Sequence, residues 1–157
     1  MACDTGRVDV TASMEAPCSP ARLFAEVESL DDYPAWMPLA HRVDAVAPDG
    51  ERPAWQVELR ARVGPLARSK RLRMVRTTHD AAAGTIVFER MEVDGRHHSA
   101  WVLRAEVTPG PEGATLRMRL HYGGGLWTGG LLERVLADQI SAGRERLRER
   151  VSAAPTR

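Results

Sequence analysis

The sequence predicts an α+β domain in which a curved, seven-stranded antiparallel sheet wraps around one long C-terminal helix. From residue 41 to residue 122, apolar and polar side chains alternate and turn sequences interrupt them at short intervals. Such short connections imply antiparallel strands. Residues 126–151 then carry one apolar stripe at helical spacing. A lone helix would leave that stripe in water, so we expect the sheet to cover it.

The chain is expected to begin with a strand and two short helices. Apolar residues alternate over residues 7–14, as in a half-buried strand. Ser19 followed by Pro20 is a typical helix start, and the apolar stripe of that helix would be Leu23, Phe24, Val27 and Leu30. Asp31 is expected to cap a second short helix over residues 32–37.

Six further strands are predicted in the middle of the chain. The clearest runs from Trp55 to Val63, where apolar residues alternate with glutamine and charged residues. The others are expected at residues 43–47, 67–77, 85–93, 99–107 and 116–122. Between two of these strands, Asp94-Gly95 is expected to form a tight type I′ hairpin.

The long helix presents its stripe through Leu132, Leu136, Ile140, Gly143, Leu147 and Val151. A glycine inside a helix costs about 1 kcal/mol relative to alanine, so Gly143 needs a reason. It either leaves room for a cavity or permits close packing against a neighbour, and the sequence leaves both interpretations open. The preceding glycine run, residues 123–125, is expected to be a flexible connection.

Composition limits the function classes. The chain has 157 residues, so residues 1–157 are expected to form a single domain, as a monomer or homodimer. A formal net charge of +1 does not favour nucleic acid. Cys3 and Cys18 are the only cysteines and form no CxxC pair, so reduced thiols and a cytoplasmic location are expected. No apolar run has the length of a membrane span.

No metal or cofactor motif is visible in the sequence. None of the five histidines belongs to an HExxH motif or has convincing metal spacing, so no metal is expected. The serines lack a GxSxG elbow. The glycine run has neither the GxGxxG register nor the lysine of a nucleotide-binding loop, so no cofactor is expected.

Two local segments carry a family resemblance. The first strand, residues 8–16, is followed by PCSPARLF at residues 17–24 and by LDDYPAW at residues 30–36. With the order of elements, these segments resemble the helix-grip fold of the START-like (SRPBCC) superfamily, which includes the major birch pollen allergen. Within it, the chain most resembles bacterial polyketide cyclase/dehydrase-type proteins. The resemblance implies a deep cavity between sheet and long helix that accepts apolar or amphipathic molecules.

The leading hypothesis is therefore binding of a hydrophobic or amphipathic small molecule, such as a lipid, an isoprenoid or an aromatic polyketide. Inward-facing aromatic and apolar residues are expected to form a mostly apolar pocket with a few polar tips. The expected ligand-binding residues are Tyr33, Trp36, Trp55, Leu72, Met74, Phe88, Ser99, Trp101, Met118, Tyr122, Leu132 and Leu136.

The alternative hypothesis is an enzyme, a polyketide aromatase/cyclase or dehydratase. It would act by orienting the substrate and excluding water. Arg76, Tyr33 or Tyr122 would stabilise an enolate. His97 shares the strand parity of Ser99 and Trp101, so it is the histidine expected to reach the cavity and carry a proton.

A basic stretch between residues 60 and 76 is the sharpest charge feature. It contains no acidic residue, and its cations are Arg60, Arg62, Arg68, Lys70, Arg71, Arg73 and Arg76. Parity places Lys70 and Arg76 at the two ends of an apolar inner face, where a cation would pair with a ligand carboxylate or enolate. The alternative interpretation is that the stretch lies on the outer face of the sheet, where its cations are solvated. Surface aromatics are not interleaved with it, so RNA ranks as the third hypothesis and nucleic acid is not an expected partner.

Overall fold

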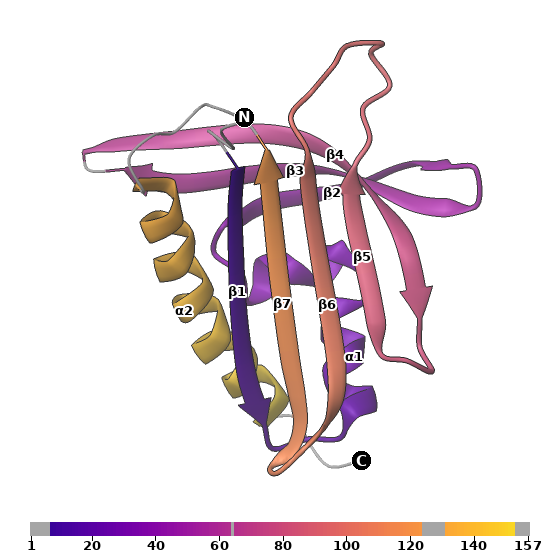
Figure 1. Cartoon of the computed structure of the whole chain (residues 1–157), viewed down its shortest axis with the longest axis vertical. Coiled ribbons are helices and arrows are strands. Elements are labelled where there is room, and N and C mark those ends of the chain that lie inside the picture. Colours follow the sequence, from indigo (N-terminus) through magenta and orange to yellow (C-terminus); the bar gives the residue numbers. More distant parts are fainter. Residues whose placement is uncertain (1–6, 64, 124–130, 153–157) are drawn as a thin grey trace, which may run out of the picture.

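The computed structural model describes residues 7–63, 65–123 and 131–152, and it confirms the predicted α+β architecture (Figure 1). One antiparallel sheet has the strand order β1-β7-β6-β5-β4-β3-β2. The strands are β1 (Arg7–Ala16), β2 (Ala40–Asp49), β3 (Arg52–Val63), β4 (Leu66–Asp80), β5 (Thr85–Arg90), β6 (Trp101–Gly110) and β7 (Gly113–Gly123). The helices are α1 (Pro20–Val27), the 3₁₀ helix η1 (Leu30–Ala35) and α2 (Leu131–Ser152).

The sheet bends so that both of its ends reach the long helix. Figure 1 shows β2, β3 and β4 running crosswise over the ends of β1, β7 and β6. Helix α2 contacts β1 at one edge of the sheet and β3 near the other edge. Strands β1 and β7 are distant in sequence but pair along their whole length, from Arg7 opposite Gly123 to Ala16 opposite Ala114. This is the helix-grip arrangement.

The start of α1 is as predicted, whereas the second helix differs. The Ser19 hydroxyl accepts a hydrogen bond from the backbone N–H of Arg22, and Pro20 occupies the first turn. The second helix is the 3₁₀ helix η1, and its cap is Ser29 rather than Asp31. The Ser29 hydroxyl accepts from the Asp31 N–H at 3.3 Å. The Asp31 carboxylate accepts instead from Nε1 of Trp55, at 3.1 Å.

The predicted type I′ hairpin at Asp94-Gly95 is wrong. Strand β5 ends at Arg90, and residues 91–100 form a loop before β6 begins. The Asp94 side chain accepts a hydrogen bond from the Arg96 N–H, and Gly95 has a φ of 74°. This local turn competes with a strand ladder for the same backbone groups. Most of the other predicted strands extend further than expected, because pairing with their neighbours continues past the alternating residues.

Gly143 permits close packing of α2. A Cβ atom at this position would lie 3.3 Å from the Trp36 carbonyl oxygen and 3.7 Å from a carbon of its indole ring. The structure therefore supports the close-packing interpretation over the cavity-making one. Leu147 and Val151 continue the stripe and are buried. Residues 126–130, where the helix was predicted to begin, lie outside the described residues.

An ion-pair cluster joins α1 to α2. The Glu26 carboxylate is buried, and it accepts hydrogen bonds from Arg22 at 2.7 Å and from Arg150 at 3.0 Å. Burial alone would raise the pKa of Glu26, but the hydrogen bonds and charges of Arg150 and Arg22 outweigh burial and lower that pKa. Of the two cysteines, Cys18 is a free thiol whose pKa is raised by burial, and Cys3 lies outside the described residues.

The first prediction concerns Gly143. Gly143→Leu should lower the free energy of unfolding by about 1–3 kcal/mol, because the new side chain has to displace the backbone of Trp36. Ala142→Leu is the matched control, since Ala142 is the preceding helical residue and is exposed. Urea unfolding of both variants provides the measurement. Equal midpoints for the two variants would contradict the close contact.

The second prediction concerns pH. Because the pKa of Glu26 is lower in the folded state, its stabilisation is present above the ordinary glutamate pKa of about 4.3 and disappears as the pH falls through the folded value. Glu26→Gln should cost about 1–3 kcal/mol at neutral pH, and this cost should shrink below about pH 4. Glu145→Gln, on an exposed position of α2, should show no such trend in the same unfolding series.

Candidate functional site

An apolar cavity lies inside the bent sheet, between the sheet, η1 with the segment after it, and α2. Its volume is about 80 Å³, several times the roughly 10–15 Å³ that one ordered water requires. Apolar and aromatic side chains line it: Val10, Leu30, Tyr33, Met37, Leu39, Ala40, Val57, Leu59, Leu72, Met74, Trp101, Leu103, Met118, Leu120 and Ile140. A cavity with such walls is favourable for hydrocarbon and unfavourable for water.

Five of the predicted ligand-binding residues lie on the cavity wall. They are Tyr33, Leu72, Met74, Trp101 and Met118. They come from η1, β4, β6 and β7, so the sheet alternation correctly indicates which side chains turn inward. Leu132 and Leu136 belong to α2, but their side chains lie outside the described residues.

Three other predicted residues pack behind the wall as an aromatic cluster. Trp36 lies against Tyr33 with ring centres 4.7 Å apart, and Phe88 meets the edges of Tyr33 and Trp55 at 5.9 Å and 5.6 Å. The polar atoms of this cluster have partners. Trp36 Nε1 donates to the Glu26 carbonyl, and Tyr33 Oη donates to the Val27 carbonyl at 3.0 Å. Burial raises the pKa of Tyr33, so this hydroxyl stays protonated. A ligand-binding role for Trp36, Trp55 and Phe88 stays a prediction.

Trp101 and Tyr122 form a second aromatic pair, on β6 and β7. They are directly opposite in the strand register, and their ring centres are 4.5 Å apart. Only Trp101 reaches the cavity wall, and Tyr122 is buried beside it. Trp101 Nε1 and Tyr122 Oη are both buried, and neither has a hydrogen-bond partner in the described part of the chain.

Two candidate catalytic residues do not reach the cavity. Arg76 was expected as a cation at the cavity mouth, but its guanidinium donates to the Glu28 carbonyl at 2.7 Å, at the end of α1. His97 was expected on the inner face by strand parity, but it is exposed on the loop because β6 starts only at Trp101. Ser99 lies on the same loop, outside the strand.

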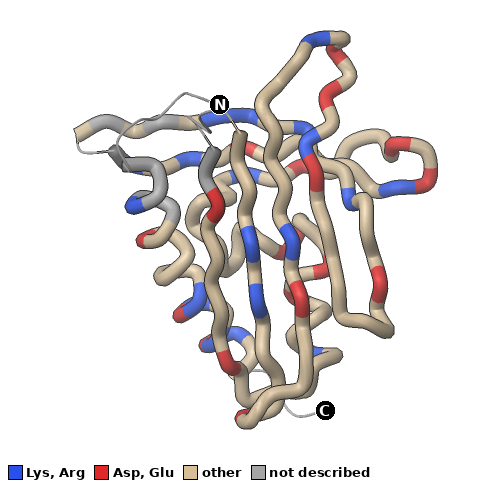
Figure 2. Tube along the Cα trace, in the orientation of Figure 1, with Lys and Arg blue, Asp and Glu red and all other residues tan. Residues whose placement is uncertain are grey.

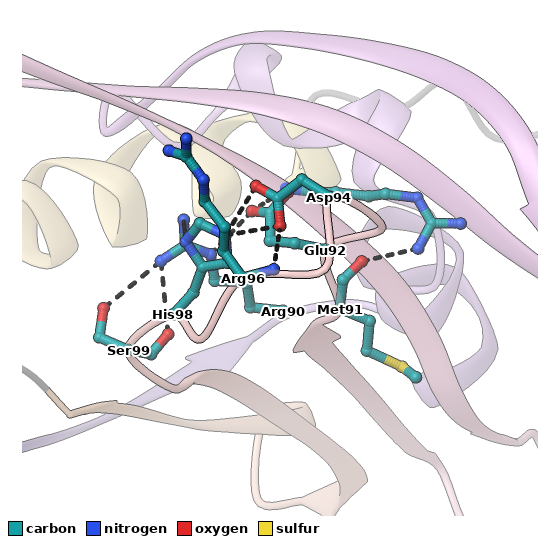
Figure 3. Close-up of polar contacts among 8 residues, drawn as sticks. Arg90, Met91, Glu92, Asp94, Arg96, His98 and Ser99 are labelled. Atoms are coloured by element: carbon teal, nitrogen blue, oxygen red, sulfur yellow. Dashed lines mark hydrogen bonds and ion pairs between the residues drawn. The ribbon is translucent and has the colours of Figure 1, made fainter.

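A polar network around Arg90 holds this loop (Figure 3). The Arg90 side chain is only 8% exposed, and it donates to Glu92 at 2.8 Å, to Ser99, and to Nδ1 of His98 at 3.3 Å. Since Arg90 donates to Nδ1, the other ring nitrogen of His98 donates to Asp94, at 2.8 Å. The hydrogen bond from the Arg96 N–H, followed by that from His98, lowers the pKa of Asp94.

Sequence reasoning missed Arg90. It pairs with Met74 in the strand register, so it belongs to the inner face, at the end of β5 that adjoins Trp101. Phe88 and Arg90 are two residues apart in β5, so their side chains lie on the same face of the sheet. This spacing could have identified Arg90 as inward-facing. Lys70 also lies on the inner face, opposite the cavity-lining Leu59. Burial lowers the pKa of Lys70, and the charge of Arg90 lowers it further.

The basic stretch is partly neutralised across neighbouring strands. Glu58 forms ion pairs with Arg60 and Arg71, at 3.4 Å and 3.8 Å. Arg73, predicted to be solvated, is largely covered: its guanidinium donates to the Met91 carbonyl and lies 3.7 Å from Asp49. Figure 2 shows basic and acidic residues together on β6 and on α2 as well, whereas β7 carries basic residues without acidic ones.

Neither a metal site nor a membrane-spanning helix is found in the described part of the chain. Across residues 7–63, 65–123 and 131–152, no three histidine, cysteine, aspartate or glutamate side chains converge as metal ligands would. Within the same ranges, no helix combines the length and the apolar character needed to cross a bilayer.

Solved structures with the same architecture share little sequence with this chain. TTHA0849 from Thermus thermophilus is 19% identical with a TM-score of 0.75, covering 95% of this chain and all of that one. A START superfamily protein from Mycobacterium smegmatis is 18% identical with a TM-score of 0.65, covering 94% and 97%. The di-domain aromatase/cyclase BexL from the BE-7585A biosynthetic pathway is 14% identical with a TM-score of 0.69, covering 95% of this chain but 51% of that protein.

At these identities the solved structures establish the fold alone. No curated protein is similar enough in sequence to count as a relative. The sequence pattern of one family does match, over residues 7–152, and that family is described as polyketide cyclase / dehydrase and lipid transport. The match spans nearly every described element, from β1 to the end of α2. The chain belongs to this polyketide cyclase/dehydrase and lipid transport family.

Proposed function

We propose that the protein binds a hydrophobic or amphipathic small molecule in the cavity between its sheet and α2. The observation that carries the proposal is a cavity of about 80 Å³ that is lined by apolar and aromatic side chains. Protein interiors seldom keep voids larger than a water molecule, because the lining atoms lose contacts there. An apolar ligand would restore those contacts.

Binding is a better account of this site than catalysis. A cyclase or dehydratase needs polar groups within about 3 Å of the reacting atoms. Arg76 is bound to the Glu28 carbonyl and His97 is exposed on the loop. Family membership and the similarity to BexL keep the aromatase/cyclase as the alternative function.

The ligand class we propose is a lipid, an isoprenoid or an aromatic polyketide. The described cavity is smaller than the roughly 300–1,000 Å³ of sites that enclose drug-sized molecules, so it would hold one ring or a chain segment. We keep a cytoplasmic location, and a monomer or homodimer, as part of the same proposal.

Ligand retention provides the direct test. Protein purified from its own organism should carry a hydrophobic molecule that native mass spectrometry detects and that organic extraction releases. The emptied protein should increase the fluorescence of a hydrophobic dye such as Nile red, and its Tm should rise when lipids or polyketides are added. If no ligand is retained, no dye binds and the Tm does not change, the proposal is wrong.

A cavity-filling substitution makes the test specific to this site. Leu103→Trp should place a larger ring in the cavity and reduce Nile red binding by at least tenfold, because Leu103 lines the wall. Arg104→Trp is the matched control: it adds the same ring at the next position of β6, where the side chain is exposed on the other face of the sheet. Leu103→Ala should keep or increase dye binding. Equal dye binding by Leu103→Trp and Arg104→Trp would place the dye elsewhere.

A further inference from the structure

Two unpartnered hydrogen-bond donors belong to one aromatic pair, in which Trp101 lines the cavity and Tyr122 is buried beside it. Trp101 is 6% exposed and Tyr122 is 1% exposed, and their rings pack at 4.5 Å. Their polar atoms, Nε1 and Oη, have no hydrogen-bond partner in the described part of the chain. A buried polar group without a partner is costly, and most such groups in native proteins are paired. Two on neighbouring residues call for a specific explanation.

The other buried aromatic donors among the described residues provide the contrast. Tyr33 donates to a backbone carbonyl, and so does Trp36. Trp55 donates to the Asp31 carboxylate. The fold thus supplies acceptors throughout the aromatic cluster, whereas it supplies none to Trp101 and Tyr122 among the residues it describes.

The pair borders the apolar volume. Trp101 lines the cavity, and so do Leu103 and Leu120, which lie two residues further along the strands of Trp101 and Tyr122. Successive inward residues of a strand are two positions apart, so the pair forms the next row of the same inner face. A molecule whose apolar part fills the cavity would bring a neighbouring polar atom to this row.

We infer that Trp101 Nε1 and Tyr122 Oη form a hydrogen-bonding subsite for a neutral oxygen, a carbonyl or a hydroxyl, of an otherwise hydrophobic ligand. The inference rests on the proposed function and defines the ligand chemistry of that site. An indole N–H and a phenol O–H can both donate to one oxygen, which has two lone pairs. The ligand then supplies the partner that the described part of the chain does not provide.

Local charges favour a neutral oxygen over a carboxylate. Arg90 occupies the adjoining position of the row, but Glu92 balances its charge at 2.8 Å and it also donates to His98. Lys70 lies on the same inner face, and burial and then the charge of the nearby Arg90 lower its pKa. A buried carboxylate at the Trp101–Tyr122 pair would have to compete for Arg90 with Glu92, Ser99 and His98, which already accept its hydrogen bonds, and a buried charge without a partner of its own is unfavourable.

Matched small probes test the subsite. Ethylbenzene and acetophenone have the same carbon skeleton and differ by one carbonyl oxygen, and benzoate supplies the anionic comparison. The unmodified protein should bind acetophenone about tenfold more tightly than ethylbenzene, as one or two hydrogen bonds to buried donors would give. Acetophenone should also shift the indole N–H signal of Trp101 in the proton–nitrogen NMR spectrum in the direction of stronger hydrogen bonding.

Two conservative variants locate the effect. In Tyr122→Phe and in Trp101→Phe, the ratio of acetophenone affinity to ethylbenzene affinity, measured on the same variant, should fall from about ten to near one. Without ligand, Tyr122→Phe should leave the Tm unchanged or raise it, because no hydrogen bond to a residue within 7–63, 65–123 or 131–152 is lost. Tyr33→Phe removes a hydroxyl that donates to the Val27 carbonyl, so its Tm should fall.

The outcomes separate this inference from the proposed function. Equal affinity for ethylbenzene and acetophenone would overturn the subsite and leave hydrophobic binding in place. A preference for benzoate would overturn the neutral oxygen in favour of an anion. A fall in Tm for Tyr122→Phe as large as that for Tyr33→Phe would mean that the Tyr122 hydroxyl has a partner within the protein. If the unmodified protein binds none of the three probes or Nile red, the proposed function fails as well.

Discussion

The burial of the apolar stripe of α2 is the constraint on which the rest of the structure depends. The helix contacts β1 at one edge of the sheet and β3 near the other, so the sheet bends to reach it from both sides. Packing is closest where Gly143 meets the backbone of Trp36. Ile140, one turn earlier in α2, already lines the cavity. The same grip therefore gives a close contact at Gly143, a small pocket of about 20 Å³ beside it and the cavity of about 80 Å³ beyond Ile140, because a helix cannot fill a curved sheet evenly.

The aromatic residues divide the interior into two chemically different parts. On one side, Tyr33, Trp36, Phe88 and Trp55 pack against one another, and the three with polar atoms donate to acceptors of the protein. On the other side, Trp101 and Tyr122 pack together with unpartnered donors in the described part of the chain. The first group is a support that fixes one cavity wall. The second retains hydrogen-bonding capacity that a ligand can use.

The sequence predicted the features that depend on local periodicity. Alternation identified Leu72, Met74, Trp101 and Met118 as inward-facing, and the Ser19-Pro20 pair identified the start of α1. Prediction from the sequence failed where a contact with a residue distant in the chain determines the position of a side chain. The acceptor of Arg76 is the carbonyl of Glu28, 48 positions earlier in the chain, which no local pattern indicates. It also failed at residues 91–100, because the Asp94 turn and the contacts of Arg90 replace the expected strand. His97 was misplaced for that reason, since parity has meaning only within a strand.

The proposed subsite differs chemically from a site that forms an enolate. Two neutral donors polarise a carbonyl, but forming an enolate also requires a base within about 3 Å of the acidic C–H. Tyr33 is the cavity-lining phenol; it donates to Val27, and burial raises its pKa, so it stays protonated. The other lining residues of the described cavity are aliphatic or thioether side chains, alanine and the indole of Trp101. In the proposed function, an apolar wall with two donors would orient a ketone or an alcohol, which is what the binding of an otherwise hydrophobic molecule requires.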